Sequence, residues 1–88
     1  MFGIFLDIES NGLDPKIHRV LEIAFQIVDL KTGQSMTSYT QTVQQPRSVW
    51  DQSDPCSLRV NGFSYQMIEH SPSEAEIQSQ IIRLFDEY

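Results

Sequence analysis

Two carboxylates, those of Asp7 and Glu9, stand at the end of an alternating run of apolar residues, Phe2–Glu9. Residues two apart on a strand project to the same side and lie about 6.5–7 Å apart along it, so both carboxylates would enter one space. Two anions held there repel unless a cation joins them, and Mg²⁺ binds through one or two carboxylates, water and substrate phosphate. The pair therefore indicates a metal-assisted phosphoryl site, with two solvated acids on an edge strand as the alternative.

Calcium binding is a second interpretation of the same segment. Asp7, Glu9 and Asn11 precede Gly12 as in the first half of an EF-hand loop. The twelfth loop position, which needs a bidentate acid, falls on His18, and the preceding residues alternate as a strand where a helix is required. The sequence therefore disfavours an EF-hand.

The composition places the chain in a broad class. Its 88 residues are 40% hydrophobic, which suits one small folded domain. Twelve acidic residues against six Lys and Arg give a net charge of −6, which opposes sequence-independent electrostatic binding to nucleic acid. The single Cys56 cannot form an internal disulfide. The N-terminal run has no basic region and contains acids, so we expect neither a signal peptide nor a membrane span, and we expect a cytoplasmic protein.

The periodicities predict three strands in the first half of the chain. After the strand over 2–9, turn-forming residues predict a loop to His18, and alternating apolar residues predict a second strand over 19–29. Lys31–Gly33 predicts a turn, and residues 35–43 are expected to return as the third, antiparallel strand. Residues 44–55 are expected to form a loop, with Trp50 packed as an anchor.

The second half predicts helices. Asp54 and Pro55 are expected to start a short helix that ends at Asn61–Gly62, and Ser64 to start a short turn through Ile68. Ser71–Glu74 has the form of a capping box, with proline at the first helical position. A stripe at helical spacing follows, made of Ile77, Ile81, Leu84 or Phe85, and Tyr88. No capping residue closes this helix, so we expect a chain that is truncated there and, with its apolar surface uncovered, self-associates.

The run Leu6–Pro15, with Arg19–Ala24 after it, resembles the first motif of the DEDD superfamily of DnaQ-like 3′–5′ exonucleases. Val60–Ser64 and the helix after Pro72 fall in step with later segments of that family. The resemblance implies a ribonuclease H-like α/β fold. It implies that residues 1–88 are the N-terminal portion of one exonuclease domain, with three antiparallel strands plus helices.

The resemblance also implies site residues and cofactors. Asp7 and Glu9 would be the catalytic metal ligands, Asp7 bridging two Mg²⁺ or Mn²⁺ ions and Glu9 binding one of them and orienting the attacking water. Ser10, Asn11, Gly12 and Leu13 would lie against the terminal nucleotide of a DNA or RNA 3′ end. The chain departs from the family by carrying Ser10–Asn11 where members usually carry Thr or Thr-Thr.

Family members use four acidic residues, and the second and third acidic motifs would follow Tyr88. Asp86 is expected to be a solvated surface acid, so we expect residues 1–88 alone to be inactive. The alternative is a catalytically silent interaction module. The sequence does not decide between DNA and RNA as the substrate, or between a free-standing nuclease and one that partners a polymerase subunit. It also leaves open whether Glu22 acts near the metal site or is only a strand residue. His18 and His70 are expected to be exposed loop residues.

Overall fold

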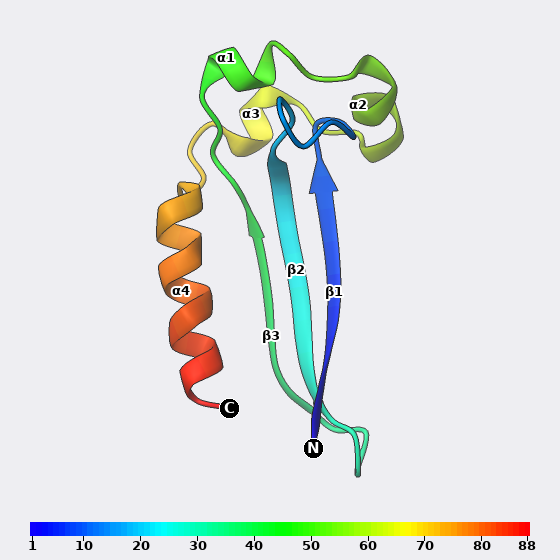
Figure 1. The fold of residues 1–88 in the computed structure, drawn as a ribbon, viewed down its shortest axis with the longest axis vertical. Coiled ribbons are helices and arrows are strands. Elements are labelled where there is room, and N and C mark those ends of the chain that lie inside the picture. The colour runs from blue at the N-terminus through cyan, green and yellow to red at the C-terminus, as the bar shows by residue number, and fades with distance from the viewer.

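The computed structural model describes residues 1–88 as a three-stranded antiparallel sheet, in the order β1-β2-β3, with four helices. Figure 1 shows the long helix beside the sheet and the three short helices gathered at the end where β1 finishes and β2 begins. The molecule is elongated, with extents of 44 × 24 × 23 Å. The elements are β1 (Phe2–Ser10), β2 (Val20–Asp29), β3 (Ser35–Thr42), α1 (Arg47–Trp50), α2 (Pro55–Asn61), α3 (Tyr65–Ile68) and α4 (Glu74–Asp86).

The three predicted strands are confirmed, and their register fixes which side chains share a face. Leu6 lies opposite Phe25, which lies opposite Tyr39, so these three side chains project from one face of the sheet. The register shifts between Glu9 and Ser10, where a bulge ends the regular pairing of β1 with β2. The hairpin between β2 and β3 places Gly33 at a φ of 76°, the left-handed conformation that glycine adopts without strain.

Two predictions for the helices need correction. Residues 44–55 are not all loop, because Arg47–Trp50 forms the short helix α1. The helix α4 is capped by Ser73, whose hydroxyl accepts from the Glu76 backbone N–H, and not by Ser71. The Ser71 hydroxyl instead contacts the Thr42 hydroxyl at 2.5 Å, which ties this segment to the end of β3. A tertiary hydrogen bond therefore replaces the local capping box.

The other caps are as predicted. Asp54 accepts a hydrogen bond from the Cys56 backbone N–H at the start of α2, and Gly62 ends that helix with a φ of 74°. Trp50 packs against Tyr65 with ring centroids 5.8 Å apart. These short helices are thereby fixed against the strand ends, where they support the loop between β1 and β2.

The core lies between the sheet and the helices. Its buried apolar side chains are Leu21, Phe25, Ile27, Val43, Ile68 and Ile77. Phe25 is stacked on Tyr39 at 5.3 Å and contacts Phe85 of α4 at 5.4 Å, so α4 covers the face of β2 and β3 that carries Phe25. On the same face of β1, Leu6 remains 59% exposed. The helix α4 therefore leaves this face of the edge strand β1 uncovered. No helix of the chain is both long and apolar enough to span a bilayer.

Candidate active site

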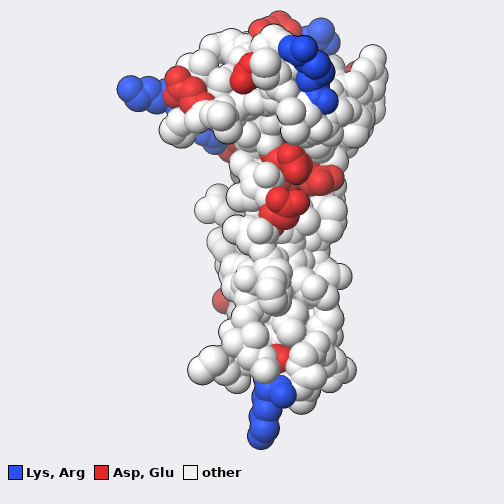
Figure 2. Space-filling model, turned by 90° about the vertical axis from the view of Figure 1, so that its right-hand side faces the viewer, with Lys and Arg blue, Asp and Glu red and all other residues white.

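The carboxylates of Asp7 and Glu9 project from the sheet face opposite α4. Asp7 lies opposite Ala24, and Glu9 lies opposite Glu22. Side chains alternate along a strand, so these residues lie on the face that Leu6 and Phe25 do not occupy. Figure 2 shows acidic side chains gathered in one group on the flank of the molecule, above a surface with few charges. The structure therefore brings the two predicted metal ligands to one face and adds Glu22 to them.

This acidic group has no cationic partner. The ion pairs of the chain use other carboxylates, those of Glu74, Asp51 and Glu69. Like charges directly opposite each other on neighbouring strands repel. The repulsion between Glu9 and Glu22 therefore destabilises this part of the sheet unless a cation binds near them. Carboxylate oxygens are the donors that Mg²⁺ and Mn²⁺ prefer, so the donor set fits such an ion. No group of three or more His, Cys, Asp or Glu side chains has the geometry of a complete metal site.

The loop after β1 carries the residues expected to meet the nucleotide. The Ser10 hydroxyl donates to the Gly12 carbonyl at 2.7 Å, and the Asn61 side-chain amide donates to the Ser10 carbonyl at 2.9 Å. Leu13 is 90% exposed at the outer side of this loop. Leu13 is one of several exposed apolar side chains of the chain, and its place on this loop leaves it free to contact an apolar or aromatic group of a ligand.

Asn11 has a structural position that the sequence did not indicate. Its side chain is fully buried, and its amide nitrogen donates to the Val49 carbonyl at 3.1 Å and to the Ser53 hydroxyl at 3.0 Å. Its side-chain oxygen accepts from the Arg19 backbone N–H at 2.8 Å. The backbone N–H of Asn11 donates to Arg19, and its carbonyl accepts from Asp54. The hydrogen-bonding groups of Asn11 are thus engaged within the protein, so it holds the loop in place.

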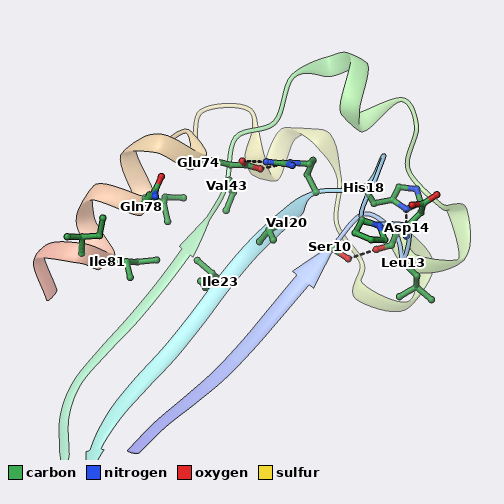
Figure 3. A pocket seen from close by; sticks show the side chains of 15 residues that line it. Ser10, Leu13, Asp14, His18, Val20, Ile23, Val43, Glu74, Gln78 and Ile81 are labelled. Atoms are coloured by element: carbon green, nitrogen blue, oxygen red, sulfur yellow. Dashed lines mark hydrogen bonds and ion pairs between the residues drawn. The ribbon is translucent and has the colours of Figure 1, made fainter. Parts of the chain in front are cut away.

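A groove of about 700 Å³ opens on the other side of the same loop. Figure 3 shows it between the loop, with Ser10 and Leu13, and the helix α4, with Gln78 and Ile81. The floor is formed by the apolar residues Val20 and Ile23 of β2 and by Val43, which directly follows β3. Asp7 and Glu9 do not line this groove, because they project from the opposite face of β1.

An ion pair that sequence reasoning missed joins the groove's two walls. The Arg19 guanidinium donates to Glu74 through Nε at 2.9 Å and through a second, shorter contact. Hydrogen bonding from Arg19 holds the pKa of Glu74 below its usual range. Gln45, which is buried, donates to Glu74 at 2.7 Å and to the Val20 carbonyl at 2.9 Å. Charge at Arg19 and Glu74 was visible in the sequence, but no local pattern linked residues 55 positions apart.

The sequence comparisons show that the chain is similar to oligoribonucleases. No family model matches it. It is 31% identical to an oligoribonuclease of Azoarcus sp., 30% identical to one of Marinobacter nauticus and 28% identical to one of Halorhodospira halophila, over 97% of its own length in each case. The aligned part makes up 48%, 49% and 48% of those proteins, so the chain spans about half the length of the curated relatives it matches.

Solved structures show the same fold. A full-length 3′-exonuclease superposes with a TM-score of 0.77 at 13% identity, covering 97% of this chain and 29% of that one. The nuclease domain of 3′hExo, a DEDDh family member bound to rAMP, gives a TM-score of 0.76 at 13% identity, covering 97% of this chain and 44% of that one.

The fold is therefore that of the ribonuclease H-like DEDDh exonuclease domains, with three antiparallel strands and helices. The chain itself is a relative of the oligoribonucleases along nearly its whole length, which confirms the resemblance to DEDD, DnaQ-like exonucleases seen in its first motif.

Proposed function

We propose that the protein is a metal-dependent 3′–5′ exonuclease that hydrolyses phosphodiester bonds at single-stranded 3′ ends, with RNA as the first substrate to test. The observation that carries the proposal is the acidic pair Asp7 and Glu9, which has no cationic partner and stands at the end of β1 beside a loop with an exposed Leu13. The oligoribonuclease relatives and the DEDDh fold support it.

In this proposal Asp7 and Glu9 hold Mg²⁺ or Mn²⁺, two ions in the complete domain. When bound, the metal would acidify a water molecule and stabilise the charge that develops on the scissile phosphate, as in two-metal hydrolysis. The two carboxylates would hold the metal and orient the water, and the loop after β1 would bind the terminal nucleotide. Leu13 would contact the terminal base, and Ser10 and Gly12 would lie along its sugar and phosphate. Asn11 would act by holding that loop, since its side chain is buried.

In this proposal Asp7 and Glu9 are two of the family's four acids, and with Glu22 nearby they do not form a complete group of three metal-ligating side chains. We therefore propose that this part alone is inactive and belongs to an exonuclease domain whose other acidic residues complete the site. A second candidate is a catalytically silent module that keeps the scaffold, which the incomplete ligand set favours. Cytoplasmic location, a polymerase subunit as partner and self-association through the uncovered β1 edge are further proposals.

The decisive experiment measures the shortening of a 5′-labelled single-stranded oligoribonucleotide and of the matching oligodeoxyribonucleotide. The full-length protein, with Mg²⁺ or Mn²⁺, should shorten at least the RNA from its 3′ end. Asp7→Ala and Glu9→Ala should each abolish this, whereas Asp86→Ala, a change to an exposed acid at the end of α4, should not. An inactive wild-type protein would support the silent module, and equal loss in all three variants would contradict the assignment of the two ligands.

Metal binding gives a test that does not depend on turnover. Added Mn²⁺ should broaden amide signals of residues 1–88 most strongly over 8–13, and the Asp7→Ala/Glu9→Ala double variant should remove the effect. Broadening centred on His70 instead would show that the pair is only a solvated surface. Sedimentation at rising protein concentration tests self-association, and a monomer throughout would refute it.

A further inference from the structure

The His18 ring lies directly against Gly12 in the loop between β1 and β2. A Cβ atom placed on Gly12 would be 2.1 Å from Nδ1 of His18 and 2.4 Å from its Cγ, closer than real side chains approach. Gly12 does not have a positive φ, so its backbone conformation is open to other residues. The glycine is therefore required by the approach of the histidine ring and not by the turn.

Both ring nitrogens of His18 are engaged. Nδ1 accepts a hydrogen bond from the Asp14 backbone N–H at 3.0 Å, which makes Nδ1 the unprotonated nitrogen of a neutral ring. Nε2 then carries the hydrogen and donates to the Gln52 carbonyl at 3.0 Å. One side chain thus joins the loop to itself and to the segment between α1 and α2, 34 residues further along the chain.

These contacts of the His18 ring hold the residues immediately before and after Leu13 in the sequence. Gly12 is buried under the ring on one side of it, and the Asp14 N–H is bonded to the ring on the other. Backbone hydrogen bonds from Ile17 and His18 to the Asp14 carbonyl, at 3.2 and 2.8 Å, close the rest of the loop. Leu13 is therefore exposed to water while both of its neighbours are held through one imidazole.

We infer that His18 is a positioning residue, which holds Gly12–Asp14 so that Leu13 is preorganised to contact the terminal base of the substrate. The inference rests on the proposed exonuclease function. It assigns no contact between His18 and the substrate, because both ring nitrogens are used within the protein. A loop held before binding loses less conformational freedom when the nucleotide arrives, so the effect of His18 belongs to substrate affinity.

The first test compares His18→Ala with His70→Ala in the full-length protein. His70 is a suitable control because its side chain is 91% exposed and its nearest charged contact, with Glu69, is 3.9 Å long. His18→Ala should raise KM for a short oligoribonucleotide by up to about thirtyfold, the factor expected for two lost net hydrogen bonds, and leave kcat within about twofold. His70→Ala should change neither. Equal effects of the two variants, or a fall in kcat without a rise in KM, would overturn the inference.

The second test uses the contact between Gly12 and the ring. Gly12→Ala should raise KM in the wild-type background, because the new methyl group displaces the ring. In the His18→Ala background the same change should add nothing, since the clash is gone. Additive effects in the double variant would show that Gly12 and His18 act separately and would overturn the inference.

A third measurement separates this inference from the proposed function. Long-range proton–nitrogen spectra of the wild-type protein should show the Nε2–H tautomer, and the Asp14 amide should exchange faster in His18→Ala than in His70→Ala. The opposite tautomer, or unchanged exchange, would refute the positioning role even in an active enzyme. If the wild-type protein is inactive, the proposed function fails, and the affinities of wild type and His18→Ala for the oligoribonucleotide decide the role instead. Equal affinities, or no binding by either protein, would refute it.

Discussion

Removal of the Asn11 side chain should destabilise the chain strongly, because three hydrogen bonds of a buried side chain are lost with it. Asn11→Ala deletes the two bonds donated to Val49 and Ser53 and the one accepted from Arg19. The side chain is fully buried, so water cannot replace the lost partners without opening the structure. At about 1 kcal/mol for each net hydrogen bond, the free energy of unfolding should fall by about 3 kcal/mol. A small domain with a stability of about 5 kcal/mol would remain folded but marginal.

Urea unfolding followed by circular dichroism measures this loss. Asn61→Ala is a graded control, because Asn61 is only partly buried and makes two bonds, to the Ser10 carbonyl and from the Phe63 backbone N–H. Because water can replace part of what these two bonds provide at a partly buried site, Asn61→Ala should lower the free energy of unfolding by only about 1 kcal/mol. Asn11→Asp keeps the shape and the acceptor but removes both donors, so it should cost at least as much as Asn11→Ala. If Asn11→Ala is no more costly than Asn61→Ala, the loop is not held by Asn11.

Three further predictions concern α4, the acidic face and pH. Ile77→Ala, at a buried position, should cost about 2–5 kcal/mol in chemical denaturation, whereas Ile82→Ala, 53% exposed, should stay within about 0.5 kcal/mol. Glu22→Gln should stabilise the metal-free chain by about 0.2–1 kcal/mol by removing its repulsion with Glu9, and it should weaken Mn²⁺ binding in a titration. Because the pKa of Glu74 is lowered, its stabilising contribution is present above its usual pKa and is lost as the pH falls below it. The deficit of Glu74→Gln, measured by thermal unfolding, should therefore shrink in acid.

The strands could be predicted because each has local periodicity that burial enforces. In β2, Leu21, Phe25 and Ile27 are buried, so the alternation in the sequence reports the face that packs under α4. The helix α4 was predicted for the same reason, since Ile77 and Phe85 meet the core through a stripe at helical spacing.

The contacts that hold the loop could not be predicted, because their partners are distant in the chain. Asn11 was expected to lie against the terminal nucleotide, yet its side chain is buried and bonds to residues 38 and 42 positions away. His18 lies in a loop as expected, but its ring is only partly exposed and both of its nitrogens are within hydrogen-bond distance of the protein backbone, which the sequence did not indicate. Both cases involve polar groups whose role depends on where the segment between α1 and α2 lies, and hydrophobic periodicity carries no information about that.

The bulge at the end of β1 explains why Asp7 and Glu9 lie on one face of the sheet while Ser10, directly after them, lines the groove on the other side. Glu9 still pairs with Glu22, but Ser10 pairs with Val20, so β2 contributes one additional residue at this point. The register shift turns the chain as it leaves the acidic face, and Ser10 and Val20 both line the groove under the loop. The proposed metal ligands and the loop proposed to contact the nucleotide are therefore adjacent in sequence but face different sides of the sheet edge. A substrate bound at this strand end would place its phosphate over the carboxylates and its terminal base against the loop.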